Sequence, residues 1–366
     1  LMALGIIEIG RLGDWGISAI SQSPNPPISS SRGSAWLMSA VAVFLFAVAA
    51  AAPWLWIRPA YQPPAYTGPL AEQTAVDFGD AMRLVGYEVA HDDLRPGDTV
   101  RVRLEWEALR PMERDWSVFV HLNDPVLGQP IAQRDMYPGA GLRTTSSLAA
   151  GERLVDEYVL TVPATAVAPA ELEVVVGLYD FATGERLPAD DGQQTTDDGA
   201  AEAGETPAIQ RDAVTLARLP LAAAEGAVPN PTSVFFEHGL ELVGFAVAPR
   251  RAAAGETIGL TTYWRPSEPL PDDFTFFAQI VGADTTRYAA ADTAPSQPTS
   301  GWTPGEIVAV ESALPLDPAT PPGVYPLIVG LYTRTAGGGF DRLQLVTPDG
   351  RLTDDFLPLT RVRVTE

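Results

Sequence analysis

The 366-residue chain has no cysteine, and all 24 of its basic side chains are arginine, so it lacks lysine as well. The missing cysteine excludes thiolate catalysis, disulfide bonds and cysteine-ligated zinc. The missing lysine excludes Schiff-base and Ser–Lys chemistry. With 46 acidic residues, the formal net charge is −22. This charge argues against nucleic acid as a partner, because phosphate recognition needs a clustered positive surface.

Long apolar runs are scarce too, with one exception. Residues 35–57 carry no charge and lie between Arg32 and Arg58. At about 1.5 Å per residue this run reaches roughly 34 Å, enough to cross a hydrocarbon core of about 30 Å. Trp54 and Trp56 lie near its end, where aromatic rings favour the headgroup interface. We predict a transmembrane helix over 35–57 that contacts membrane lipid; a cleaved signal peptide is the alternative, since nearby alanines could form a cleavage site.

The charges around this run predict its orientation. Arg11 and Arg32 precede it and Arg58 follows it, which favours an N-terminus on the cytoplasmic side. Residues 58–366 contain 22 arginines against 44 acidic residues, so the whole net charge lies beyond the run. We therefore expect a large, acidic extracytoplasmic part.

An internal repeat is the strongest pattern in the sequence. Landmarks of the first half recur in the same order in the second half, at offsets that shrink from 158 to 153 residues. Drift of this kind, confined to loops, indicates a duplicated domain. The matched landmarks are 84–87 with 242–245, 97–98 with 255–256, Trp106 with Trp264, Phe119 with Phe277, 145–146 with 299–300, 151–152 with 305–306, and 177–179 with 330–332.

Each copy has the period-two alternation of half-buried strands. In the first copy, apolar Val100, Val102, Leu104 and Trp106 alternate with charged Arg101, Arg103, Glu105 and Glu107, which predicts one buried and one solvated face. The 34 prolines and 32 glycines supply frequent turns. We predict an all-β fold of two tandem antiparallel, Ig-like β-sandwich domains after one N-terminal transmembrane helix.

The composition also predicts where these parts begin and end. The segments are an N-terminal interfacial segment and linker (1–34), the transmembrane helix (35–57), a Pro-rich linker (58–75), β-sandwich domain 1 (76–221) with an acidic loop (188–210), a linker (222–231) and β-sandwich domain 2 (232–366).

A search for catalytic, cofactor and metal residues assigns none. The three histidines lack metal-ligand spacing, and nucleophile-elbow, Walker and dinucleotide motifs are missing. His121 has Gln279 as its counterpart and is interpreted as a polar surface residue. Acidic pairs could bind calcium, but the loop that begins at Asp190 lacks the required spacing, so a solvated loop is the default.

Three further carboxylates, Asp135, Asp156 and Asp180, are the best catalytic candidates. Only Asp135 has an acidic counterpart, Asp292, in the second copy. A duplicated active site would not be expected to lose two of its three carboxylates, so we predict that the chain is not an enzyme in itself.

Aromatic residues offer the remaining candidate contacts. Trp106 and Trp264 lie on the apolar strand faces and are predicted to be core residues. Trp116, Tyr137 and Trp302 fall at strand starts or in loops. We mark these three as candidate ligand or partner contacts, with sugar stacking as one use and ordinary packing or a protein interface as the others.

The order of the motifs resembles a known family. The motifs are Arg58 to Pro64, Phe78 to Asp80, Leu84 to Tyr87, Pro96 to Asp98, Phe119 to Leu122, Gln133 to Asp135, 151–152 and Gly177 to Asp180. Together they are similar to the extracytoplasmic C-terminal β-domain of large membrane glycosyltransferases of the mannosyltransferase-like superfamily in Chloroflexi-type bacteria. The resemblance covers residues 55–220 well and the second copy more loosely.

This resemblance implies a bacterial cytoplasmic membrane and an extracytoplasmic β-domain. The family transfers sugars from polyprenyl-phosphate donors within a bundle of transmembrane helices, which this chain does not contain, so no catalytic residue carries over. We therefore expect a non-catalytic, membrane-anchored binding or structural protein, such as an accessory subunit with a protein partner. The alternatives are the C-terminal part of a glycosyltransferase and a glycan-binding module.

Overall fold

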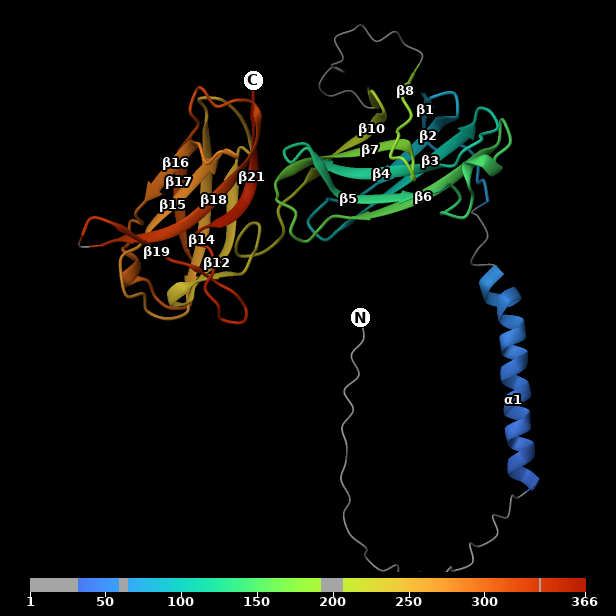
Figure 1. Ribbon diagram of the computed structural model, residues 1–366, viewed down its shortest axis with the longest axis horizontal. Coiled ribbons are helices and arrows are strands. Elements are labelled where there is room, and N and C mark those ends of the chain that lie inside the picture. Colours follow the sequence, from blue (N-terminus) through green and yellow to red (C-terminus); the bar gives the residue numbers. More distant parts are fainter. Residues whose placement is uncertain (1–31, 59–64, 192–206, 336) are drawn as a thin grey trace, which may run out of the picture. The chain divides into compact units, whose positions relative to one another are not determined.

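The computed structural model describes residues 32–58, 65–191, 207–335 and 337–366. Within these ranges the protein consists mostly of β-strands in antiparallel sheets, with one long helix near the N-terminus (Figure 1). The chain divides into two compact units, Leu1–Gln62 and Pro63–Glu366. The interfacial segment predicted within 1–34 falls almost wholly outside the described residues, as does most of the acidic loop.

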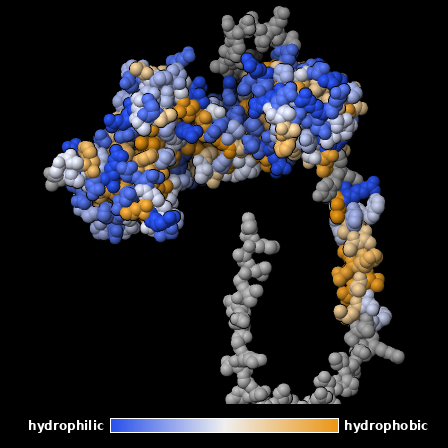
Figure 2. Space-filling view, in the orientation of Figure 1, coloured by the Kyte–Doolittle hydropathy of each residue, from blue (hydrophilic) through white to orange (hydrophobic). Residues whose placement is uncertain are grey.

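The helical unit contains the predicted membrane span. Helix α1 (Arg32–Ala52) continues into a π-helical turn, η1 (Pro53–Ile57), because proline lacks the N–H that an α-helical hydrogen bond requires. The stretch Trp36–Ile57 is long and apolar enough to cross a membrane, and hydrophobic residues cover much of the helix in Figure 2. At its end the Arg58 guanidinium lies 5.2 Å from the centre of the Trp54 ring.

The first repeat, residues 72–221, forms two five-stranded antiparallel sheets. Their strand orders are β6-β3-β2-β1-β8 and β5-β4-β7-β10-β9. Residues of both sheets join one hydrophobic core, in which Trp106 and Tyr158 are fully buried. The strands are β1 (Glu72–Phe78), β2 (Met82–Ala90), β3 (Thr99–Ala108), β4 (Trp116–Asp124), β5 (Gln129–Met136), β6 (Arg153–Thr161), β7 (Ala170–Asp180), β8 (Ala189–Asp190), β9 (Ala208–Gln210) and β10 (Ala213–Leu221).

The second repeat, residues 234–365, has the same plan. A five-stranded sheet, β17-β14-β12-β11-β20, accompanies a six-stranded sheet, β13-β21-β18-β15-β16, with β19 on β18. Only β13 and β21 pair in parallel among the described strands. The strands are β11 (Val234–Phe236), β12 (Leu240–Ala248), β13 (Arg251–Ala253), β14 (Thr257–Pro266), β15 (Thr275–Val281), β16 (Arg287–Thr293), β17 (Val308–Pro315), β18 (Gly323–Arg334), β19 (Phe340–Arg342), β20 (Leu345–Val346) and β21 (Leu357–Thr365).

The core packing of the two repeats matches in geometry. Phe78 lies 5.5 Å from Trp106 at an interplanar angle of 60°. Phe236 lies 5.4 Å from Trp264 at 61°. These edge-to-face pairs match in geometry as well as in sequence position, and both tryptophans are buried, as predicted.

A hydrogen-bonded corner also recurs, in the 3₁₀ turns η2 (Thr145–Ser147) and η4 (Thr299–Gly301). The Thr145 hydroxyl accepts the N–H of Trp116 at 2.8 Å. The Thr299 hydroxyl accepts the N–H of Phe274, also at 2.8 Å. Both threonines are fully buried, so each turn is fixed to the strand that starts beside it.

Several details differ from the sequence predictions. Glu105, expected on a solvated strand face, is fully buried. The segment before β1 covers it: the Tyr66 hydroxyl donates to Oε1 at 2.7 Å and the N–H of Leu70 donates to Oε2 at 3.1 Å. Strand β1 begins at Glu72, ahead of the predicted boundary at residue 76. The ends of the predicted acidic loop are strands, β8 and β9, while residues 192–206 lie outside the description.

The two repeats contact each other within the unit Pro63–Glu366. Arg250 Nη2 lies 2.8 Å from Asp124 Oδ2, and both side chains are about 95% buried, with 5% and 4% exposed. In the predicted linker, Asn230 is 8% exposed. Its amide donates to the carbonyls of Ala168 and Phe245 at 2.7 and 3.0 Å. These contacts join the repeats through buried polar groups.

Candidate functional site

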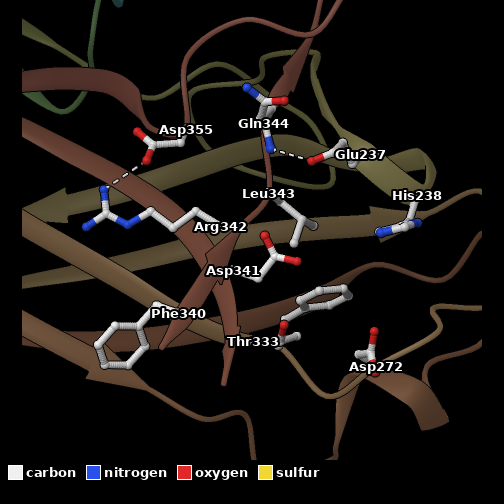
Figure 3. Close-up of a pocket in the computed structure, with 11 residues that line it drawn as sticks. Glu237, His238, Asp272, Thr333, Phe340, Asp341, Arg342, Leu343, Gln344 and Asp355 are labelled. Carbon is white, nitrogen blue, oxygen red and sulfur yellow. Dashed lines mark hydrogen bonds and ion pairs between the residues drawn. The ribbon is translucent and has the colours of Figure 1, made fainter. Parts of the chain in front are cut away.

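A hollow of about 540 Å³ opens beside the β18–β19 hairpin of the second repeat (Figure 3). Five separate segments of the chain line this hollow. They are η3 (Glu237–Gly239), the turn before β15, the end of β18, strand β19 with the residues after it, and the turn before β21. We call it the rim hollow. Its lining residues are Glu237, His238, Asp272, Phe274, Thr333, Phe340, Asp341, Arg342, Leu343, Gln344 and Asp355.

One wall of the rim hollow is fixed by Arg342. Its Nη1 lies 3.1 Å from Asp355 Oδ2, and its guanidinium carbon lies 4.8 Å from the centre of the Phe277 ring. A guanidinium can pair in its plane with a carboxylate while its face rests on an aromatic ring. Both interactions engage Arg342, although the Arg342 and Asp355 side chains remain 42% and 43% exposed.

The opposite wall comes from η3, where Glu237 and His238 follow each other (Figure 3). Glu237 Oε2 accepts the N–H of Gln344 at 2.8 Å, which ties η3 to the segment after β19. His238 has a φ of 58°, a left-handed conformation that residues other than glycine rarely adopt and that recurs at functional sites. Its ring stacks near that of Phe274, with centroids 6.0 Å apart.

The floor and lip of the rim hollow are acidic and aromatic. Asp272 and Asp341 are both exposed. Phe340 is an exposed ring, with 63% of its surface accessible, and it packs edge-on against Tyr332 at 4.9 Å. The Arg334 guanidinium carbon lies 6.0 Å from the centre of the Phe340 ring, and Phe340 points away from Asp341 in Figure 3.

The charges predict what this hollow can hold. Four carboxylates line it, those of Glu237, Asp272, Asp341 and Asp355, and the single arginine among the lining residues is paired with Asp355. The site is therefore negative and suits a ligand that carries positive charge and several N–H donors. Among the described residues, no group of three His, Asp or Glu side chains could hold a metal ion.

The predicted aromatic contacts lie elsewhere. Trp116 is 7% exposed and Trp302 is 3% exposed. Trp302 stacks on Phe276 with centroids 5.8 Å apart, and its Nε1 donates to the carbonyl of Gln297 at 3.0 Å. Both rings point into the core, which agrees with ordinary packing, one of the uses considered for them, and leaves little ring surface for sugar stacking. Tyr137 is half-buried, and its role as a contact stays a prediction.

Asp156, one of the three carboxylates singled out in the sequence, is fully buried. It accepts the N–H groups of Gly139 and Ala140, both at 3.0 Å. Burial raises the pKa of Asp156, while these two N–H bonds lower it in part. Its contacts hold the turn at residues 139–140, which is a structural role.

Asp135 and Asp180 have other partners than Asp156. Asp135 Oδ1 is 3.3 Å from His121 Nε2, and His121 is largely covered by its neighbours, with 13% of its side chain exposed, so the surface position predicted for it is wrong. Asp180 interacts with Arg114, and the N–H of Ala182 is the leading cause that lowers the pKa of Asp180. The three carboxylates thus serve three separate places.

Partial signals for the rim hollow are present in the sequence. Asp272 belongs to an acidic pair, and His238, one of three histidines, directly follows Glu237, but nothing in the sequence brings Asp272 beside Glu237 or either of them beside Asp341. Comparison of the chain with models of protein families gives no match, and comparison with curated proteins gives no significant match.

Proposed function

We propose that the chain is a single-pass membrane protein that carries two tandem, Ig-like β-sandwich domains on the extracytoplasmic side of a bacterial cytoplasmic membrane and acts by binding. The observation that carries the proposal is the rim hollow, a negatively charged site with an exposed aromatic ring whose own arginine is already paired. Such a site suits recognition of a ligand or partner, in line with a non-catalytic accessory role.

The sheet arrangement supports the domain proposal. Each repeat contributes two sheets, and in the first repeat residues of both sheets share one core. Two sheets packed face to face around alternating inward residues are the defining feature of a β-sandwich. The recurrence of the aromatic pair and of the threonine corner supports two domains of common descent.

The charge distribution supports the orientation. Residues 58–366 carry the entire formal charge of −22. An acidic surface is repelled by anionic headgroups of the cytoplasmic leaflet, and positively charged residues favour the cytoplasmic end of a span. A protein-binding role outside the membrane fits this asymmetry.

The absence of cysteine makes a direct test simple. Glu311→Cys, an exposed position on β17, and Ser23→Cys, before the span, each introduce a single thiol. In spheroplasts, a membrane-impermeant maleimide should label Glu311→Cys fully and Ser23→Cys only after permeabilisation. The reverse pattern, or labelling of neither thiol before permeabilisation, would overturn the proposed location.

The glycosyltransferase resemblance stays a second proposal, supported by the order of the motifs alone. If the chain works as the C-terminal part of such an enzyme, the genomic sequence upstream of Leu1 should encode several further hydrophobic spans. An upstream sequence without such spans would count against it.

A further inference from the structure

The rim hollow has a counterpart in the first repeat, and there the corresponding place is occupied by an arginine of the chain itself. The corner threonines establish the correspondence. Thr145 donates its hydroxyl to the carbonyl of Arg114 at 3.2 Å, and Thr299 donates to the carbonyl of Asp272 at 2.7 Å. Asp272 thus holds the backbone position that Arg114 holds in the first repeat.

In the first repeat, the Arg114 side chain closes the corner. Its Nη1 donates to Glu185 Oε2 at 2.7 Å and to Asp180 Oδ2 at 3.2 Å. Its guanidinium carbon lies 5.2 Å from the centre of the Trp116 ring. Two carboxylates and an aromatic ring therefore hold one guanidinium, and these contacts raise the pKa of Arg114, with the Glu185 hydrogen bond as the leading cause.

The surroundings of that guanidinium persist in the second repeat. Strand pairing places Tyr179 opposite Ser117 and Tyr332 opposite Thr275, so Thr333 corresponds to Asp180. Thr333 in turn pairs with Asp341, just as the N–H of Asp180 donates to the carbonyl of Glu185.

Asp341 therefore replaces Glu185, and Phe274 replaces Trp116. One carboxylate is kept, at Asp341, while Thr333 replaces the Asp180 carboxylate and Asp272 replaces the arginine. The Phe274 ring is 3% exposed and is stacked by His238.

A further substitution adds negative charge. The N–H of Gly79 donates to the carbonyl of Pro188 at 2.8 Å. In the second repeat, the N–H of Glu237 donates to the carbonyl of Gln344 at 3.0 Å. Glu237 hence stands where the first repeat has Gly79. The second repeat has lost the internal cation and gained the carboxylates of Asp272 and Glu237 around the same place.

We infer that the rim hollow binds the guanidinium group of an arginine side chain presented by a peptide or protein partner. This inference rests on the proposed binding function and names its ligand chemistry. A planar guanidinium can donate to several carboxylates at once and rest a face on an aromatic ring, whereas a lysine ammonium is a compact and strongly hydrated charge. The carboxylates of Asp272, Asp341 and Glu237 provide the acceptors. Phe340 points to the opposite face of β19 from Asp341 and has the Arg334 guanidinium 6.0 Å from its ring centre.

The test uses the full chain in detergent micelles and ligand-observed NMR titration. The probe is Nα-acetyl-arginine amide, which mimics an arginine within a peptide. The comparison probes are the matching lysine and citrulline amides and free arginine, which carries an α-ammonium and an α-carboxylate that an arginine within a peptide lacks. We expect the arginine amide to bind about tenfold more tightly than the lysine amide, and the neutral citrulline amide to bind more weakly than both.

Variants place the binding at the rim hollow. Asp272→Asn should weaken arginine-amide binding about fivefold, as the loss of one charged contact predicts. Asp272→Arg, which restores the arrangement of the first repeat, should abolish it. Glu311→Gln removes an exposed carboxylate elsewhere in the second repeat and should leave binding unchanged. Near-ultraviolet circular dichroism of each variant shows whether the fold is retained.

Equal affinity for the arginine and lysine amides, or equal effects of Asp272→Asn and Glu311→Gln, would overturn the inference. Tighter binding of free arginine than of the amide would also overturn it, because the ligand would then be the free amino acid and not an arginine side chain of a protein partner. Binding of a neutral oligosaccharide at the hollow, with no binding of the arginine amide, would overturn the inference and identify a glycan as the ligand. In each case the maleimide labelling reports separately on the proposed location.

Discussion

The two repeats place different chemistry at the same corner of the same framework. In the first repeat Arg114 fills the corner, held between Glu185, Asp180 and the Trp116 ring. In the second, Asp272 takes its place and the corner is open. The buried threonine below it and the strand that starts beside it are unchanged. Substitutions at an exposed rim cost little stability, so duplicated copies can diverge there while their cores stay alike.

The repeats also differ inside. Strand pairing aligns Asp156 of the first repeat with Val310 of the second, since Leu104 pairs with Asp156 and Thr262 with Val310. The carboxylate is fully buried and depends on two backbone N–H groups, whereas the valine needs no partner. In the first repeat a buried carboxylate thus stabilises a turn, whereas in the second repeat an apolar side chain packs at the same position.

The largest expected effect tests the core that the repeats share. Trp106→Ala and Trp264→Ala should each lower the free energy of unfolding by about 3–5 kcal/mol, because each removes a large buried ring and leaves a cavity. Chemical denaturation followed by far-ultraviolet circular dichroism measures both. A cost below about 1 kcal/mol for either variant would contradict the equivalence of the two core positions.

Phenylalanine substitutions sharpen this test. Trp264 Nε1 donates to Thr262 Oγ1 at 2.8 Å, while among the described residues Trp106 Nε1 has no partner. Trp264→Phe should therefore cost about 1 kcal/mol more than Trp106→Phe, because only the former loses a buried hydrogen bond. Equal costs would show that the two indole nitrogens have equivalent surroundings.

An intermediate effect is expected at the corner threonines. Thr145→Val and Thr299→Val keep the shape of the side chain but remove the hydroxyl that accepts a buried N–H at 2.8 Å in both repeats. Each variant should be destabilised by about 1–3 kcal/mol, the cost of leaving a buried donor unsatisfied. Denaturant titration measures the loss.

The exposed neighbour provides the control for this pair. Thr144→Val, at an exposed position directly before η2, should change stability by less than about 0.5 kcal/mol. A clear loss at one corner threonine and none at the other would show that the corner is not a shared feature of the repeats.

The smallest effect on stability, and the sharpest test of the contrast, is expected at Arg114. Arg114 and Glu185 are 51% and 55% exposed and Asp180 is 13% exposed, so Arg114→Gln should lower stability by about 1 kcal/mol at most. The same substitution removes the internal guanidinium from Asp180 and Glu185. In an Asp272→Arg background, where the rim hollow is closed, Arg114→Gln should create a new site for Nα-acetyl-arginine amide in the NMR titration. No gain of binding would show that the first-repeat corner is not a guanidinium site when emptied.

Much of the fold could be predicted from local pattern. The alternation from Val100 to Trp106 predicted the buried face of β3, and the recurrence of Trp106 as Trp264 predicted the duplication. The apolar run at 35–57 predicted the helix, because a single continuous segment contains enough apolar residues to cross a membrane. These features depend on neighbours in the sequence, so the sequence suffices to find them.

Burial of single side chains could not be predicted in the same way. Glu105 follows the polar alternation of its strand and is nevertheless covered by Tyr66 and Leu70. Trp116 and Trp302 begin strands or end turns, and their rings turn into the core and not toward a ligand. In each case a segment distant in sequence decides whether water reaches the side chain.

The sequence by itself determined the two copies, their strands, their tryptophan cores and the acidic charge beyond one apolar helix, since periodicity and composition record these directly. Only the tertiary structure decided which carboxylates meet. Glu237, Asp272 and Asp341 come from three separate segments, and their approach depends on strand pairing that no local pattern encodes. The arginine that fills one corner and the space that remains in the other become comparable only after both copies have folded.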